Sequence, residues 1–269
     1  MGAVLTSHAI VQRFTGYEWL ACSRVMDDQQ VLHVARRLNA LRLSLADLRK
    51  FYSNLHASNP ISGFIHPRFC PSITSYRDEH GLIVKFKYAK PLERDATCVM
   101  YLAVREDTNE PIVVKFVRRY GLSAHRWMAG KGLAPNLICH SQLGDGYDNL
   151  AIVIMEYIDG QTLAGIYGTE PLPEDVVRGV HKALEVLGNG GFVFGDLRRP
   201  NVMISKGGGP AEERIRFIDF DWAGYEGQDL RYPFHLAEHI TKCRGQDYGV
   251  IQREHQEKML EELIHPTRV

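Results

Sequence analysis

FVFGDLRRPNVMISKGGGPAEERIRFIDFDWAG, residues 192–224, is the stretch of this chain that decides its fold. Within it, Asp196 is followed five residues later by Asn201, on a turn that Pro200 keeps from being helical. After a glycine-rich break, an apolar run delivers Asp219 at its end. Loops at strand ends present side chains to clefts. Because magnesium prefers a few oxygen ligands together with substrate phosphates, these side chains predict a site for divalent-metal and phosphate chemistry.

The composition is that of an ordinary soluble globular protein, with 24% charged and 45% hydrophobic residues in a chain of 269. Lys and Arg number 32, as do Asp and Glu, so the net charge indicates no nucleic-acid or membrane-surface partner. No apolar run approaches the roughly 20 residues that span a bilayer. The five cysteines form no C-x-x-C pair, which predicts a cytoplasmic location, with the nucleus as the alternative.

The N-terminal third predicts a helical extension followed by a linker. Apolar residues recur three and four apart over 29–57, although Ser44 and Asp47 form a capping-box pattern that would break the helix near 43–44. The pattern favours an amphipathic helix that packs on its own domain, with a dimerising coiled coil as the alternative. No periodicity follows over 59–78, so residues 1–80 are predicted to form the extension and linker.

The middle of the chain predicts antiparallel strands followed by a mainly helical part. Strand patterns occupy four segments: 82–88, 98–104, 111–117 and 150–158. Lys115 lies inside the third strand, where a lysine is rarely buried without a partner. A helix is predicted over 173–187, with Pro173 at its start and Gly188 just past its end. The order of these elements indicates a two-lobed α+β architecture.

Four motifs in this order resemble the protein-kinase-like fold: VVKF around Lys115, MEYIDG at 155–160, GDLRRPN at 195–201 and DFD at 219–221. They resemble in particular the short, divergent protein-kinase-domain proteins that are abundant in fungi. The GD pair is also similar to that of aminoglycoside and choline phosphotransferases. The resemblance covers roughly residues 82–230.

The resemblance implies a two-lobed fold with an antiparallel N-lobe sheet and a shortened helical C-lobe. The kinase-like domain is then expected over 81–269, with the N-lobe at about 81–158 and the C-lobe at about 159–269.

The resemblance also implies ATP and Mg²⁺ as cofactors. Lys115 would hold the α and β phosphates of ATP. Backbone groups of Glu156 to Ile158 would pair with adenine as a hinge, while Met155 faces the pocket behind it.

Four residues of the opening stretch receive catalytic or metal-binding roles from the resemblance. Asp196 would orient or deprotonate the acceptor hydroxyl. Arg198 stands where protein kinases carry a lysine that reaches the γ-phosphate. Asn201 and Asp219 would bind Mg²⁺.

The sequence also departs from the family pattern. Residues 90–98, KPLERDATC, replace the glycine-rich loop. No Asp or Glu occurs between Lys115 and Gln142, so the usual ion-pair partner of the lysine is missing, and a neutral His125 is a poor substitute. Lys115 either pairs elsewhere, for instance with Asp219, or the site is impaired. Immediately before Asp196, Phe194-Gly195 replaces the His-Arg pair of the family, and no APE triplet follows the DFD motif.

Three functions follow as alternatives. The first is an ATP- and Mg²⁺-dependent Ser/Thr protein-kinase-like phosphotransferase that transfers the γ-phosphate to a hydroxyl. The second is a small-molecule kinase, which the GD pair and the trimmed C-lobe favour. The third is a pseudokinase that binds nucleotide or partners without transfer, in which the helix at 29–57 would be a docking element. The acceptor, a protein or a small molecule, stays open.

Overall fold

The computed structural model of the chain describes residues 28–53, 71–93, 99–144, 147, 150–227, 230–233, 236, 238–243 and 245–266. The chain divides into two compact units, and the first contains helix α1 (Asp28–Ser53). The second unit begins at Thr74. Much of the predicted extension and linker lies outside the described residues, and the domain boundary near residue 80 stays a prediction. No helix in the described ranges is long and apolar enough to cross a membrane.

Helix α1 is continuous, so the predicted break near 43–44 is wrong. One reason is that an interior Ser costs an otherwise regular helix less than about 1 kcal/mol. The predicted end of the helix at residue 57 lies outside the described residues. Val31, Leu38 and Leu45 on this helix are exposed. How the helix packs, and whether it docks a partner, stay predictions.

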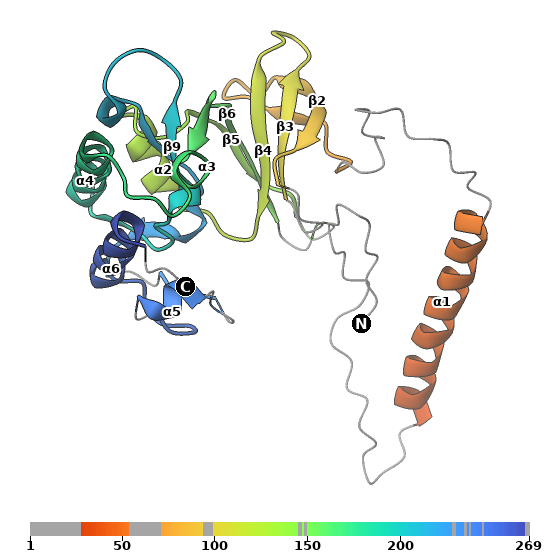
Figure 1. The fold of residues 1–269 in the computed structure, drawn as a ribbon. Helices are drawn as coiled ribbons and strands as arrows, with labels where there is room; N and C mark the ends of the chain where they lie inside the picture. The colour runs from red at the N-terminus through yellow and green to blue at the C-terminus, as the bar shows by residue number, and fades with distance from the viewer. Residues whose placement is uncertain are drawn as a thin grey trace. The chain divides into compact units, whose positions relative to one another are not determined.

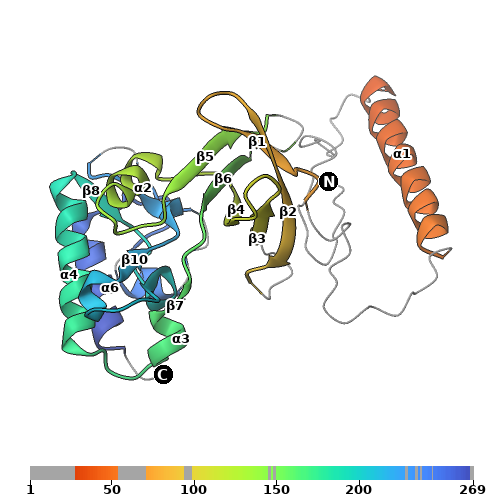
Figure 2. The ribbon, with the colours of Figure 1, turned by 90° about the horizontal axis from the view of Figure 1, so that it is seen from above.

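The N-lobe is a six-stranded antiparallel sheet in the order β1-β2-β3-β4-β6-β5 (Figures 1 and 2). Its strands are β1 (Ser75–Arg77), β2 (Ile83–Pro91), β3 (Met100–Arg105), β4 (Pro111–Val117), β5 (Leu137–Gln142) and β6 (Ala151–Glu156). The four predicted strands are confirmed as β2, β3, β4 and β6, whereas β1 and β5 were not predicted. Lys115 pairs with Met100 on one side and Val153 on the other, in the middle of the sheet.

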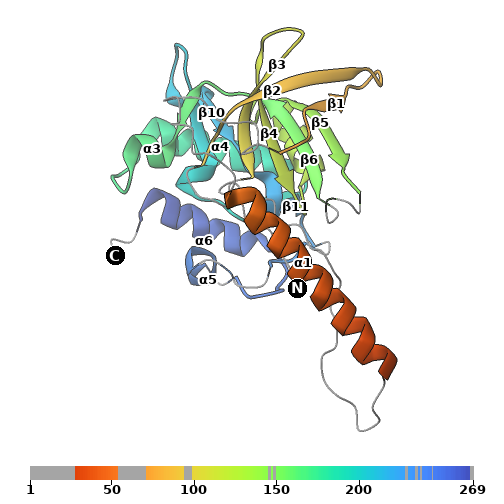
Figure 3. The same cartoon turned by 90° about the vertical axis from the view of Figure 1, so that its right-hand side faces the viewer.

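Helix α2 (Leu122–Ala129) follows β4 and packs its buried Ala124 and Met128 into the core of the C-lobe. The C-lobe itself carries α3 (Leu163–Tyr167), α4 (Glu174–Asn189), α5 (Glu238–Lys242) and α6 (Arg253–Ile264). Pro173 precedes α4 as predicted, and the apolar face of that helix is buried. Helices α4 and α6 lie on the side of the lobe away from the N-lobe sheet, and α5 lies beside α6 (Figures 1, 2 and 3).

The opening stretch of the sequence folds into two small sheets. Strands β9 (Val202–Ser205) and β10 (Ile215–Phe217) pair with each other, and β9 also pairs with β7 (Gly160–Thr162). Strand β8 (Phe192–Phe194) pairs with β11 (Ala223–Tyr225). These pairings bring the GDLRRPN and DFD motifs together, although more than a dozen residues separate them in the chain.

Two backbone hydrogen bonds join these two motifs directly. The Gly195 N–H donates to the Trp222 carbonyl (2.7 Å), and the Ile218 N–H donates to the Asn201 carbonyl (2.9 Å). A Cβ at position 195 would lie 2.7 Å from the Trp222 carbonyl oxygen, so only glycine fits there.

The turn that contains Pro200 is a single turn of 3₁₀ helix, η3 (Arg199–Asn201), which corrects the prediction that it is not helical. Proline is tolerated in a first helical turn, where its missing N–H has no bond to make. Two further 3₁₀ turns are η4 (Ala211–Glu213) and η5 (Phe220–Trp222).

Candidate active site

Lys115 forms two short ion pairs with the DFD motif, and these three residues are called the lysine cluster below. Its Nζ lies 2.7 Å from Asp219 Oδ1 and 2.6 Å from Asp221 Oδ1. The lysine side chain is 6% exposed, whereas the aspartates are 28% and 27% exposed. An ammonium has three N–H donors, and the third one of Lys115 has no partner among the described residues. The cluster therefore presents a buried, fixed cation with one donor available.

The environment of the lysine cluster shifts the pKa of Lys115 and of Asp221. Burial lowers the pKa of Lys115, but the two carboxylates outweigh it and hold the pKa above the ordinary lysine value. Burial, and then the charge of Asp219, raise the pKa of Asp221 above the ordinary aspartate value, although Lys115 acts in the opposite direction. Lys115 is therefore charged at neutral pH, and a positive group that binds near the two aspartates would relieve their repulsion.

Asp219 was predicted as a partner of Lys115, and that alternative is the one observed. The role of Asp221 in the pair was not predicted. The signal was present in the sequence, because the third residue of the motif is an acid in a chain that lacks one between Lys115 and Gln142.

The backbone at Asp219 is in the left-handed conformation, with φ of 66°. Few residues other than glycine adopt it, although aspartate tolerates it better than most. The next residue, Phe220, is anchored on both sides: it stacks on His125 at 4.6 Å and meets Phe194 edge-on at 5.4 Å. The packing of Phe220 thus holds the aspartates that flank it.

His125 is not the partner of Lys115. Its Nδ1 lies 2.7 Å from the Tyr120 hydroxyl, and its Nε2 lies 2.7 Å from the Pro135 carbonyl oxygen. Burial lowers the pKa of His125 to about 4, so the ring is neutral. Its function in the fold is to support Phe220.

Asp196, Arg198 and Asn201 form a second cluster, called the catalytic loop below after the role that the resemblance implies. The Asp196 Oδ2 accepts hydrogen bonds from Arg198 Nε (3.0 Å) and from Asn201 Nδ2 (2.9 Å). The Asn201 amide also donates to the Asp196 carbonyl (2.9 Å). The Asp196 side chain is 9% exposed, whereas that of Arg198 is 43% exposed. The side chain of Arg198 is thus partly exposed, and its remaining guanidinium donors have no partner among the described residues.

Arg199, the next residue, has a different environment that the sequence did not reveal. It is buried and donates hydrogen bonds to four backbone carbonyls: those of Gly168, Glu170, Leu263 and Ile264. Burial lowers the pKa of its guanidinium. Arg199 joins the loop to the end of α6 and to the residues after α3.

The predicted hinge, Glu156 to Ile158, lies at the end of strand β6. Met155 is buried, and Glu156 ends β6. The Glu156 N–H already donates to the Asn136 carbonyl (2.9 Å), so it is not available to a ligand. The N–H and carbonyl of Ile158 have no partner among the described residues. Ile158 therefore keeps a backbone donor for a ligand, whereas Glu156 does not.

The donor set fits a magnesium ion bound with nucleotide phosphates. Asn201 uses its Nδ2 on Asp196, which leaves the amide oxygen as its free ligand atom. Asp219 follows Ile218, whose N–H bonds to the Asn201 carbonyl. One amide oxygen and one carboxylate are the few protein ligands that Mg²⁺ needs when phosphates and water complete the shell. The residues of the replaced glycine loop at 94–98 lie outside the described residues.

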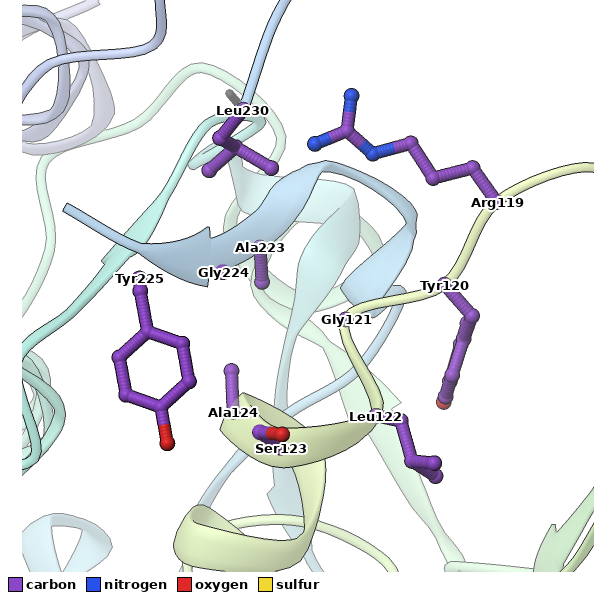
Figure 4. A pocket seen from close by; sticks show the side chains of 10 residues that line it. All are labelled: Arg119, Tyr120, Gly121, Leu122, Ser123, Ala124, Ala223, Gly224, Tyr225 and Leu230. Atoms are coloured by element: carbon purple, nitrogen blue, oxygen red, sulfur yellow. The ribbon is translucent and has the colours of Figure 1, made fainter. Parts of the chain in front are cut away.

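An open cavity of about 370 Å³ lies between the start of α2 and β11, and none of the predicted site residues lines it (Figure 4). Its wall includes Arg119, Ser123, Tyr225 and Leu230. Arg119 donates to the Arg231 carbonyl (2.6 Å) and lies over the Trp222 ring. Because no residue of either cluster lines this cavity, it is not the candidate active site.

Comparisons with known proteins bear on the fold of the chain. No family model matches the chain. A probable serine/threonine-protein kinase of Streptomyces coelicolor is 32% identical over 94 residues, which are 32% of this chain but only 13% of that protein. The kinase PK-1 of Cydia pomonella granulovirus matches with a TM-score of 0.50 at 15% identity, over 66% of this chain and 68% of that one. The BubR1 kinase domain matches with a TM-score of 0.52 at 15% identity, over 85% and 73%.

These likenesses show the fold of the chain. The chain has the two-lobed α+β fold of the protein-kinase-like superfamily, with an antiparallel N-lobe sheet and a helical C-lobe.

Proposed function

We propose that this protein is an ATP- and Mg²⁺-dependent phosphotransferase that moves the γ-phosphoryl group to a hydroxyl. The observation that carries the proposal is the joining of the two clusters. Gly195, which precedes Asp196, and Asn201 are tied through backbone hydrogen bonds to the segment whose aspartates hold Lys115. Phosphoryl transfer requires mostly positioning and electrostatic stabilisation, because the reaction needs little covalent chemistry from the protein.

Each cluster has a part in this reaction. The free donor of Lys115 would bind the α and β phosphates, and Ile158 would donate to adenine beside the buried Met155. When bound between Asn201 and Asp219, Mg²⁺ would neutralise the developing charge on the phosphates.

The catalytic loop would act on the acceptor. Asp196 would orient the hydroxyl and take its proton, because its carboxylate is fixed by Arg198 and Asn201. The remaining donors of Arg198 would reach the γ-phosphate.

A Ser/Thr side chain of a protein is the first acceptor that we propose, and a cytoplasmic protein fits the composition. A small-molecule hydroxyl is the second acceptor, favoured by the GD pair at 195–196. The pseudokinase alternative loses one of its supports, because Lys115 does have carboxylate partners. In that alternative α1 would dock a partner.

The test is a transfer assay with γ-labelled ATP, run on the protein alone, with a protein mixture and with a metabolite pool. The variant is Asp196→Asn, and its matched control is Asp107→Asn, in an exposed turn where Asp107 pairs with Arg105. We expect label transfer by the wild type and the control, and a loss of at least about 100-fold for Asp196→Asn. Absence of transfer by the wild type in all three settings, or full activity of Asp196→Asn, would contradict the proposal.

A further inference from the structure

Asp221 has no role in the proposed reaction, yet its carboxylate makes the shorter of the two ion pairs to Lys115 (2.6 Å). Helix α2, which packs against the same segment, reads LSAHRWMA and offers no carboxylate. No acid stands anywhere between Lys115 and Gln142. Apart from Asp219, the described residues give Lys115 no other anionic partner.

Lys115 needs a carboxylate that stays with it when nucleotide binds. Its side chain is almost fully buried, and a buried ammonium without an anion is strongly unfavourable. Asp219 is the proposed ligand of Mg²⁺, so its negative charge would then be shared with the metal. Asp221 is the remaining carboxylate, and it already lies at hydrogen-bond distance.

The position of Asp221 is set by the fold on both of its flanks. Phe220 before it is fixed by His125 and Phe194, and its carbonyl accepts from the Gly121 N–H (2.8 Å). Ala223 after it pairs with Phe194 in the β8–β11 sheet. Position 121 is held so closely against the Ala223 carbonyl that a side chain there would collide with it. Asp221 is therefore presented to Lys115 by a segment that α2 and β8 hold in place.

We propose that Asp221 is the positioning residue for Lys115: it holds the ammonium toward the nucleotide phosphates and supplies the carboxylate that α2 lacks. This inference rests on the proposed function. Asp221 acts through Lys115 and touches neither the nucleotide nor the metal.

The opposing assignment is that Asp221 is itself a metal ligand beside Asp219. The two assignments differ in one respect. If Asp221 acts only through Lys115, replacing Asp221 should not lower activity further once Lys115 has been replaced. If Asp221 binds the metal, replacing it should still lower activity in that background.

The test is a double-mutant cycle of Lys115→Met and Asp221→Asn in the full chain, with Asp221→Glu as the conservative variant and Asp107→Asn as the control. Three quantities are measured: kcat and KM for ATP, the affinity for Mg²⁺·ADP, and Tm without nucleotide. We expect Asp221→Asn alone to lower kcat/KM by about 10- to 100-fold, and Asp221→Glu to retain more activity than that variant. In the Lys115→Met background, Asp221→Asn should lower kcat/KM and Mg²⁺·ADP affinity by less than about 2-fold further.

If Asp221→Asn lowers kcat/KM and Mg²⁺·ADP affinity by the same factor in the wild type and in Lys115→Met, the inference is overturned and Asp221 is assigned as a metal ligand. Unchanged kcat/KM in Asp221→Asn would overturn it too.

The Tm measurements separate this inference from the proposed function. If the wild type neither binds Mg²⁺·ADP nor transfers phosphate, the proposed function fails, but the Lys115–Asp221 pair is still tested without ligand. Tm changes that depart from additivity by more than about 3 °C support the pairing. Additive Tm changes would overturn it.

Discussion

Asp196, Arg198 and Asn201 lie within six residues of one another and bond side chain to side chain, whereas Lys115 reaches across 104 and 106 residues to its aspartates. The catalytic loop is thus fixed mainly by local contacts around η3. The lysine cluster exists only when β4 and the DFD segment are both in place. A change in the catalytic loop should therefore affect the chemistry more than the stability. A change at or beneath the lysine cluster should affect both.

The largest expected effect comes from Asp219→Ala, because Asp219 is both a proposed Mg²⁺ ligand and a partner of Lys115 in the lysine cluster. We expect at least about a 100-fold loss in kcat/KM, because both a metal ligand and a partner of Lys115 disappear. The increase in Tm that Mg²⁺·ADP gives the wild type should also vanish, since binding to the native state is what raises it. Asp107→Ala is the control. An unchanged shift with Mg²⁺·ADP would refute the assignment of Asp219.

The neighbouring arginines offer the sharpest contrast between local chemistry and long-range support. Arg199→Ala should lower the free energy of unfolding by about 3 kcal/mol, because the buried guanidinium and its hydrogen bonds to four backbone carbonyls are lost. Arg198→Ala should change it by less than about 1 kcal/mol, since its ion pair is partly exposed, while lowering turnover. Urea unfolding and the transfer assay measure the two effects. Equal destabilisation by both substitutions would break the contrast.

Acid should weaken the support beneath the lysine cluster through His125. The pKa of this buried histidine is about 4 in the fold and ordinarily 6.5, so the unfolded chain binds a proton first as the pH falls. The stability that the neutral His125 contributes is therefore lost as the pH falls from about 6.5 to about 4. Over this range the free energy of unfolding should decrease by up to about 3 kcal/mol. In urea unfolding, the stability advantage of the wild type over His125→Gln should shrink by that amount from pH 7 to pH 4. A constant difference across this range would show that His125 is not buried as a neutral ring.

The smallest expected effect concerns Tyr232. Its hydroxyl is buried without a hydrogen-bond partner among the described residues, and burial, with smaller contributions from Cys243 and Asp196, raises its pKa. Tyr232→Phe should change the free energy of unfolding by less than about 1 kcal/mol, because no hydrogen bond is lost. A loss well above that in thermal or urea unfolding would mean that the hydroxyl has a partner in solution.

The same contrast explains how much the sequence predicted. The catalytic loop was predictable because its residue types and spacing are local, and β4 because its run PIVVKFV is β-branched and apolar. Strand β5 was missed because its residues are half-buried or exposed and give no alternation.

The second carboxylate of Lys115 was missed for another reason. The DFD motif shows an acid at 221, but the motif alone does not say which of its two aspartates meets Lys115. That is determined by how β4 and η5 come together, and both aspartates make the contact. The carbonyl partners of Arg199 are likewise far away in the chain, in the residues after α3 and at the end of α6.

The most direct measurement is a crystal structure with Mg²⁺ and a non-hydrolysable ATP analogue. The account predicts the metal on Asn201 and Asp219, the γ-phosphate beside Asp196, and Lys115 on the phosphates while still bonded to Asp221. A nucleotide bound away from these residues, or a Lys115 that leaves Asp221 on binding, would contradict this prediction.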